Sequence, residues 1–262
     1  MRRPKRTSVV PSNVLALVAL GIFFAIEVQA SVSEEETFEY HFKWTFVPAA
    51  SAKFTVTHDR QEGKDVVILD ASARSSRLVD PLWKMRDRMR AMYASDTGKS
   101  MNYELSQREN LRQVETRVEF DEGAGVARTS WRKRKGKGEW EEKEYDVPFG
   151  DACDPLTAAM LIRKMDFDAE EEHHIQVVSG KSIFKVTLKK VDAEVVKTRA
   201  GKFNTVKLEL TAEEIYPPPD PGEEKEEKVE AVHLWISKED NPKLIQMQAK
   251  AFVGSVTAQL VK

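Results

Sequence analysis

The stretch Phe-Glu-Tyr-His-Phe-Lys-Trp-Thr-Phe, residues 38–46, decides the fold. Aromatic residues occupy every second position, and polar residues stand between them. Because successive side chains of a β-strand point to opposite faces, this alternation predicts a half-buried strand with one aromatic face. That face is expected to comprise Phe38, Tyr40, Phe42, Trp44 and Phe46.

Alternating or β-branched stretches recur at short intervals along the rest of the chain. The turns between the first of them carry glycine, which accepts the backbone conformations that tight turns need. Many short strands joined by such turns predict a mainly β protein, a curved antiparallel sheet that forms a half-barrel or barrel. The expected strands between residues 50 and 150 are 53–57, 65–73, 91–95, 101–105, 116–120, 126–131 and 140–147.

One segment has helical spacing instead. Asp154 precedes Pro155, and apolar residues follow up to Met165 with the period of a helix. An acceptor side chain before a proline in the first turn is typical of a helix N-terminus. We therefore expect one short helix over residues 154–166, and strands resume after it.

The first thirty residues have the three zones of a secretory signal. A basic start is followed by an apolar run over residues 14–26 and by the small-residue ending Val28-Gln29-Ala30. The run is shorter than the roughly 20 residues that a membrane-spanning helix needs. We expect cleavage after Ala30, which leaves residues 31–262 as a single β domain without a stable transmembrane anchor.

Composition narrows the function further. Without residues 1–30 the chain holds 37 Lys and Arg against 42 Asp and Glu, a net charge of −5. This charge argues against nucleic acid as a partner. Cys153 is the only cysteine, so an intrachain disulfide is excluded and no cysteine stands at the cleavage point to receive a lipid. The expected product is an exported protein that is not a lipoprotein.

Several short motifs follow one another in a fixed order along the chain. They are Ala49-Ala50-Ser51-Ala52, Arg86-Asp87-Arg88, Asp154-Pro155-Leu156, Thr198-Arg199-Ala200-Gly201-Lys202-Phe203-Asn204, Leu234-Trp235-Ile236-Ser237-Lys238-Glu239-Asp240 and Phe252-Val253-Gly254-Ser255. This ordered set resembles the bacterial periplasmic family catalogued as domain of unknown function 3108, and the resemblance covers about residues 38–260. It implies a periplasmic location in a Gram-negative envelope and a curved sheet of the lipocalin-like or lipoprotein-carrier-like kind, but no catalytic residue.

Our first functional hypothesis is a carrier whose concave face holds a lipid, an acyl chain or another apolar small molecule. Ligand pockets are concave and mostly apolar, so aromatic residues and the helix would line it. The alternative is a structural or interaction module with a protein partner in the envelope, in which the same residues fill the core. The candidate ligand-binding residues are Phe42, Trp44, Trp83, Met160 and Trp235.

Other chemistry has weaker support in the sequence, and we expect neither an enzyme nor a cofactor. His173 and His174 are adjacent, so on a strand they point to opposite faces and cannot bind one metal ion together. Carboxylates beside Cys153 disfavour a reactive thiolate. The basic residues 132–137, flanked by Trp131 and Trp140, fit either a solvated hairpin tip or a contact with lipid phosphates.

Overall fold

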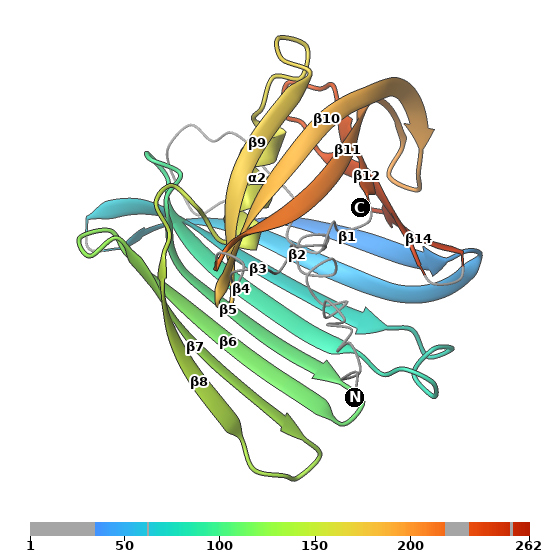
Figure 1. Ribbon diagram of the computed structural model, residues 1–262. Helices are drawn as coiled ribbons and strands as arrows, with labels where there is room; N and C mark the ends of the chain where they lie inside the picture. Colours follow the sequence, from blue (N-terminus) through green and yellow to red (C-terminus); the bar gives the residue numbers. More distant parts are fainter. Residues whose placement is uncertain (1–34, 62, 218–230, 252–253) are drawn as a thin grey trace, which may run out of the picture.

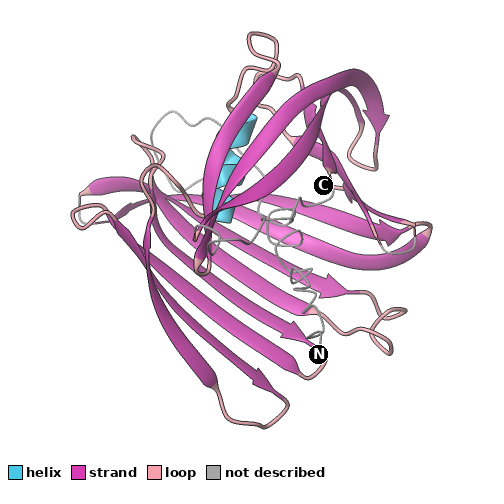
Figure 2. Cartoon of the chain, viewed as in Figure 1, coloured by secondary structure: helices cyan, strands magenta, loops and turns pink. Residues whose placement is uncertain are grey.

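A computed structural model describes residues 35–61, 63–217, 231–251 and 254–262, and these form one antiparallel sheet with one helix (Figures 1 and 2). The helix is α2 (Pro155–Arg163). The strands are β1 (Glu35–Trp44), β2 (Val47–Gln61), β3 (Lys64–Ser75), β4 (Arg86–Ala94), β5 (Ser100–Glu109), β6 (Arg112–Asp121), β7 (Val126–Lys135), β8 (Glu141–Pro148), β9 (Glu172–Ser179), β10 (Ser182–Lys197), β11 (Lys202–Tyr216), β12 (Val232–Ser237), β13 (Leu244–Lys250) and β14 (Ser255–Leu260).

The sheet is a meander that the pairing of β1 with β14 makes continuous. Its order is β8-β7-β6-β5-β4-β3-β2-β1-β14-β13-β12-β11-β10-β9, so β8 and β9 are the two edges. The sheet curls without closing, and the segment with α2 connects its edges inside the curl (Figure 2). The expected fold class, a curved antiparallel sheet with one short helix, is therefore confirmed.

Alternation along each strand gives the sheet two different faces. We call the side that faces α2 the inner face and the opposite side the outer face. On β4, Met89, Ala91 and Tyr93 are buried on the inner face, whereas Arg88 and Arg90 are exposed on the outer face. Period-two patterning of this kind pins the register, because a slip of one residue would place arginines in the core.

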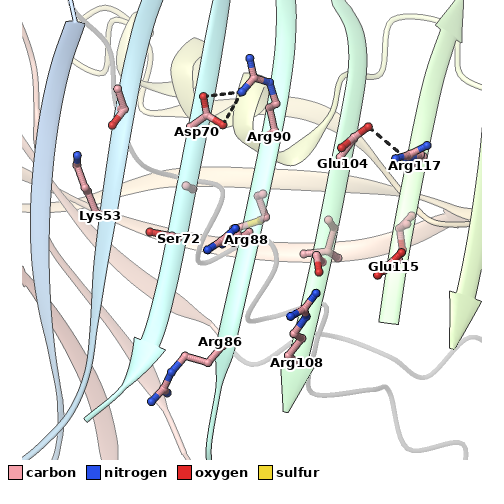
Figure 3. A pocket seen from close by; sticks show the side chains of 16 residues that line it. Lys53, Asp70, Ser72, Arg86, Arg88, Arg90, Glu104, Arg108, Glu115 and Arg117 are labelled. Atoms are coloured by element: carbon pink, nitrogen blue, oxygen red, sulfur yellow. Dashed lines mark hydrogen bonds and ion pairs between the residues drawn. The ribbon is translucent and has the colours of Figure 1, made fainter. Parts of the chain in front are cut away.

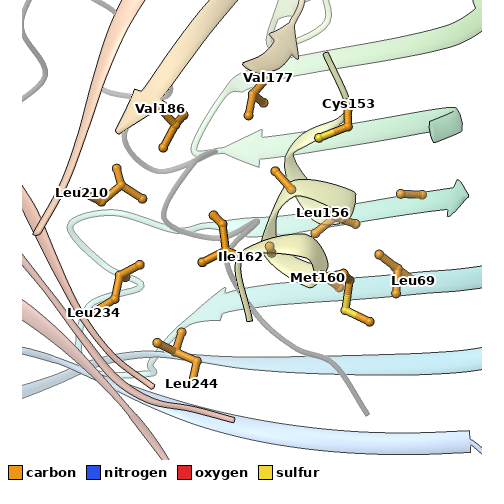
Figure 4. Close-up of a cluster of buried hydrophobic side chains, with 14 of the residues drawn as sticks. Leu69, Cys153, Leu156, Met160, Ile162, Val177, Val186, Leu210, Leu234 and Leu244 are labelled. Atoms are coloured by element: carbon orange, nitrogen blue, oxygen red, sulfur yellow. The ribbon is translucent and has the colours of Figure 1, made fainter. Parts of the chain in front are cut away.

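The core of the protein surrounds α2, which is almost entirely buried. Asp154 is its N-cap, as the sequence predicted, and the helix ends at Arg163. Leu156, Met160 and Ile162 lie between the two halves of the sheet (Figure 4). They join apolar side chains from both halves into one cluster, among them Leu69, Val177, Val186, Leu210, Leu234 and Leu244.

The segment before α2 ties the two halves of the sheet together. The Cys153 amide donates to the carbonyl of Gln176 on β9 at 3.0 Å, and the Val178 amide donates to the carbonyl of Cys153 at 2.9 Å. A second tie is made directly between the two halves, where the Thr129 hydroxyl of β7 donates to the carbonyl of Gly180 in the β9–β10 turn at 2.9 Å. These bonds cover part of the β9 edge, whose free amides would otherwise invite pairing with another chain.

The aromatic face expected over residues 38–46 is wrong in its second half. Phe38, Tyr40 and Phe42 are buried, but Trp44 and Phe46 are exposed. The pairing of β1 with β2 shifts register between Phe42 and Lys43, and Thr45 adopts a positive φ of 56° in the turn. A register shift changes which face a side chain occupies, so the alternation ends at Phe42.

Some sequence-based expectations fall outside the described residues. The signal over residues 1–30, with cleavage after Ala30, is one of them, and Phe252-Val253 of the last motif is another. Within the described ranges, no helix is both long and apolar enough to cross a bilayer.

Candidate functional site

A buried carboxylate fixes the start of α2 on the inner face. One oxygen of Asp154 accepts from the amides of Leu156 and Thr157 at 2.8 and 2.9 Å. The other accepts from the hydroxyls of Ser100 and Thr157, both at 2.5 Å. Burial raises the pKa of Asp154, and these four donors oppose that shift because they stabilise the charged form.

A buried guanidinium lies at the other end of the same helix. Arg163 is buried, and burial lowers its pKa to about 9, opposed by the nearby Tyr40, Glu36 and Tyr93. A value near 9 leaves the guanidinium charged at neutral pH. An acidic N-cap and an arginine in the last turn both complement the helix dipole. Side chains of the helix are buried between the two halves of the sheet.

The five candidate residues from the sequence occupy different environments. Phe42, Met160 and Trp235 all belong to the buried cluster. The indole nitrogen of Trp235 donates to Glu194 at 2.6 Å. Trp44 and Trp83 are exposed. The structure thus does not bring the five together, and ligand binding by them stays a prediction.

A groove lies on the outer face, across β2 to β6 (Figure 3). Its volume is about 820 Å³. Arginines from β4, β5 and β6 line it, with serines and carboxylates between them. The polar lining residues are Lys53, Thr55, Asp70, Ser72, Arg86, Arg88, Arg90, Glu104, Ser106, Arg108, Glu115, Thr116 and Arg117.

Strand register arranges these side chains in rows across the sheet. Lys53 pairs with Ser72, Ser72 with Arg88, and Arg88 with Ser106. Directly paired residues on one face have Cβ atoms about 5 Å apart. Arg88 therefore has a hydroxyl-bearing neighbour on each side, and Lys53 lies one strand beyond Ser72.

Every carboxylate in the groove is engaged by an arginine. Arg90 binds both oxygens of Asp70 at 3.1 Å. Arg117 contacts Glu104 at 3.2 Å, and Glu115 is paired with Arg132.

At the end of the groove, Arg86 donates to Asp80 at 2.6 Å. Hydrogen bonds from Arg86 and then from Ser75 lower the pKa of Asp80 to about 2. This carboxylate is thus ionised and occupied at neutral pH.

Three cations of the groove have no such partner. Within the described part of the chain, the side chains of Lys53, Arg88 and Arg108 form no ion pair and no hydrogen bond. All three are exposed. An exposed arginine held between hydroxyls, with its own donors unused, is suited to bind phosphate or carboxylate oxygens.

The groove continues along the outer face in the direction away from Arg86. A second hollow of about 460 Å³ shares Arg90, Glu104 and Arg117 with it. A third, of about 730 Å³, shares Met92, Asn102 and Glu119 with the second. The outer face of β3 to β6 therefore offers an extended track and not an isolated pit.

Reactive groups are scarce by comparison. The described ranges contain no group of three His, Cys, Asp or Glu side chains that could hold a metal ion. Cys153 is buried, and burial raises the pKa of its thiol well above the usual value, with the neighbouring Asp154 adding to the shift. A thiol in this environment stays protonated and unreactive.

Sequence reasoning missed the outer groove. Arg86, Arg88 and Arg90 stand at every second position, which by itself indicates only a solvent-facing strand. The signal that was available is their spacing, because it places three guanidiniums in line on one face. What could not be read from one strand is that serines from β3 and β5 flank them.

A sequence model of the family described as protein of unknown function, DUF3108, matches residues 37–261. The resemblance seen in the ordered motifs is thereby confirmed. No curated protein sequence matches the chain.

Two solved structures are similar to this one. The first is a beta-barrel-like protein of domain of unknown function DUF1849 from Brucella abortus, with 10% identity and a TM-score of 0.47 over 88% of this chain and 96% of that chain. The second is described as a candidate exported protein with a YmcC-like fold from Bacteroides fragilis. It has 8% identity and a TM-score of 0.39 over 92% of this chain and 98% of that chain.

Proposed function

This chain belongs to the DUF3108 family of proteins of unknown function, and we propose that it is an exported, non-enzymatic binding protein whose ligand lies in the outer-face groove. The ligand carries phosphate or carboxylate groups. One observation carries the proposal: Arg88, Arg108 and Lys53 line a groove of about 820 Å³ without a partner among the described residues, while each groove carboxylate is already engaged.

The ion pairs around these cations support the proposal. Asp70, Glu104 and Glu115 are held by Arg90, Arg117 and Arg132, so they are not available to neutralise Arg88 or Arg108. An anion that enters the groove therefore meets positive charge and donors that no carboxylate of the groove occupies.

Export is part of the proposal and draws on the N-terminal pattern. A basic start, a short apolar run and Val28-Gln29-Ala30 are the zones of a secretory signal. Envelope glycolipids and cell-wall polymers present phosphate and carboxylate groups, which fits the ligand class of the groove.

Carriage of an apolar ligand on the inner face remains the second hypothesis. Phe42 and Met160 both belong to the apolar cluster around α2. A ligand would have to displace side chains that are now packed, at the free-energy cost of opening a filled core. Native mass spectrometry of protein purified from the periplasm distinguishes the two, since a stoichiometric acyl species would favour the inner face.

The direct test is calorimetric titration of pyrophosphate into the protein at low ionic strength. We expect R88Q/R108Q to weaken binding by about tenfold or more, because each charge-assisted hydrogen bond contributes roughly 1.5–3 kcal/mol. The matched control is K197Q/K202Q, two exposed lysines paired across the β10–β11 hairpin. Equal loss in both variants would mean that net charge alone is responsible, and no loss in R88Q/R108Q would refute the groove.

A further inference from the structure

Four hairpin turns lie next to one another at the same end of the strands, and hydrogen bonds connect each turn, or a residue close to it, to its neighbour. We define the hairpin rim as residues 43–47, 76–85, 109–112 and 134–140, which join β1 to β2, β3 to β4, β5 to β6 and β7 to β8 (Figure 1). The Ser76 amide donates to the carbonyl of Ala49 at 2.7 Å. The Asn110 amide donates to the carbonyl of Lys84 at 2.8 Å, and the Gly136 amide to that of Leu111 at 2.6 Å.

Large apolar side chains are concentrated on this rim. Nine large hydrophobic residues are exposed in the described part of the chain, and six of them belong to the hairpin rim. Soluble proteins rarely expose so many large apolar side chains in one region unless that region contacts another surface. The six, with their exposed fractions, are Trp44 44%, Phe46 82%, Leu78 69%, Leu82 83%, Trp83 42% and Leu111 63%.

The same rim is basic although the whole chain is acidic. Its four segments hold seven Lys or Arg and three Asp or Glu, a net charge of +4, against a formal charge of −2 for the chain. Two of the acids, Asp80 and Glu109, are paired with arginines. Lys135 and Lys137 are exposed at the tip of the β7–β8 turn.

Trp140 stiffens that basic tip. The guanidinium carbons of Arg132 and Arg134 lie 4.6 and 4.5 Å from the centre of its ring. Cation–π contacts of this kind hold the turn in one shape. They leave Lys135 and Lys137 directed to solvent beside the exposed Leu111.

The turns at the opposite end of the same strands provide an internal comparison. Its turns at 63–65, 95–99 and 121–126 hold two Lys against four Asp or Glu, a net charge of −2. None of the nine exposed hydrophobic residues belongs to these turns. The turns at the two ends of the strands thus differ in both polarity and charge. A soluble protein does not need such a difference to stay in solution.

From this asymmetry we propose that the hairpin rim docks on an anionic lipid surface. Phe46, Leu78, Leu82 and Leu111 enter the headgroup region, and the lysines and arginines beside them meet lipid phosphates. Apolar side chains with basic neighbours, standing on the tips of separate turns, are suited to a soft and negatively charged interface. Tryptophan at the border, as at Trp44 and Trp83, is typical of membrane interfaces. The proposal does not depend on the ligand of the outer groove.

The test is flotation of the full chain with vesicles of phosphatidylcholine that contain about 30% phosphatidylglycerol. We expect F46S/L82S to lower the partition coefficient by about tenfold or more, since two large side chains no longer leave water. K135E/K137E should lower it as well, and salt should shrink that difference because exposed charges are screened. All variants retain the same N-terminal segment, so differences between them report the rim.

The control variant is V191S/V195S, which removes two of the exposed apolar residues on β10, away from the rim. It should float like the wild type. The substituted rim side chains are mostly exposed, so the thermal midpoint should stay unchanged in F46S/L82S and exclude unfolding as the cause. Flotation that is absent, or equal in F46S/L82S and the wild type, would overturn the proposal. So would a dimer that F46S/L82S converts to a monomer without any effect of vesicles, because the rim would then bind a second copy.

Discussion

At the scale of single residues, Asp154 does the most to place α2 inside the sheet. It caps the helix and binds Ser100 of β5, so one carboxylate connects the helix to the first half of the sheet. Cys153, the residue before it, binds β9 in the second half through its backbone. Asp154-Pro155 was therefore a correct sequence signal for the helix, but the tie to Ser100 could not be read from it because the partner is far away in the chain.

Replacing Asp154 should be costly for stability. We expect Asp154→Ala to lower the free energy of unfolding by about 3 kcal/mol, from the lost cap and the hydroxyls left without an acceptor. Asp166→Ala is the control. Asp166 also accepts two backbone amides, from Asp168 and Ala169, but it is exposed, so its loss should cost less than about 1 kcal/mol. Urea unfolding measures both, and equal losses would contradict the special role of the buried network.

Asp87 makes stability depend on pH. It is buried on the inner face, and burial raises its pKa to about 6, although the Arg108 amide donates to it at 2.9 Å. The folded protein therefore holds a proton between about pH 4 and pH 6 that the unfolded chain releases. Stability should fall as pH rises through this window, by up to about 3 kcal/mol.

Asp87→Asn should remove that slope. The amide oxygen can still accept from Arg108, so the variant should match the wild type near pH 4 and exceed its stability above pH 6. Urea midpoints of both proteins across this range check the prediction. A wild-type protein that is stabilised relative to Asp87→Asn above pH 6 would reverse the sign and refute it.

At the scale of elements, the period of the hydrophobic residues and the position of turn residues predicted most strands and the helix. They did not predict local irregularities such as register shifts. Residues 38–46 show why: Phe38, Tyr40 and Phe42 are buried as expected, but a register shift and the turn at Thr45 expose Trp44 and Phe46. A bulge depends on the partner strand, so the alternation of one segment cannot reveal it. The outer groove escaped sequence analysis for the same reason, since it arises from the register of β2 to β6.

The packing of α2 in the core should contribute strongly to the stability of the fold. Leu156 lies at its first turn and is fully buried among residues of both halves of the sheet. Leu156→Ala should lower the free energy of unfolding by about 3 kcal/mol through lost burial and the cavity left behind. Leu111→Ala, at an exposed turn, should change it by less than about 0.5 kcal/mol. Chemical unfolding of the two variants decides whether α2 is part of the core or a loosely seated plug.

At the scale of the whole molecule, the antiparallel sheet has two different faces, and its turns gather at two opposite ends of the strands. In an up-and-down sheet, the first, third, fifth and seventh turns lie at the same end of the strands, so the position of the hairpin rim follows from the order of the strands. With all strands assigned correctly, the sequence could therefore have predicted which turns lie next to one another. It could not have shown that α2 is buried on the inner face, or that a groove lies on the outer face.

The most direct test of this account is a map of backbone amide chemical shifts during titration with pyrophosphate. If the outer face is the binding surface, the shifts should centre on Ser72, Arg88 and Ser106 and should need about tenfold more pyrophosphate in R88Q/R108Q. Shifts that centre on α2 and the inner-face residues around Met160, or that saturate at the same pyrophosphate concentration in R88Q/R108Q, would contradict it.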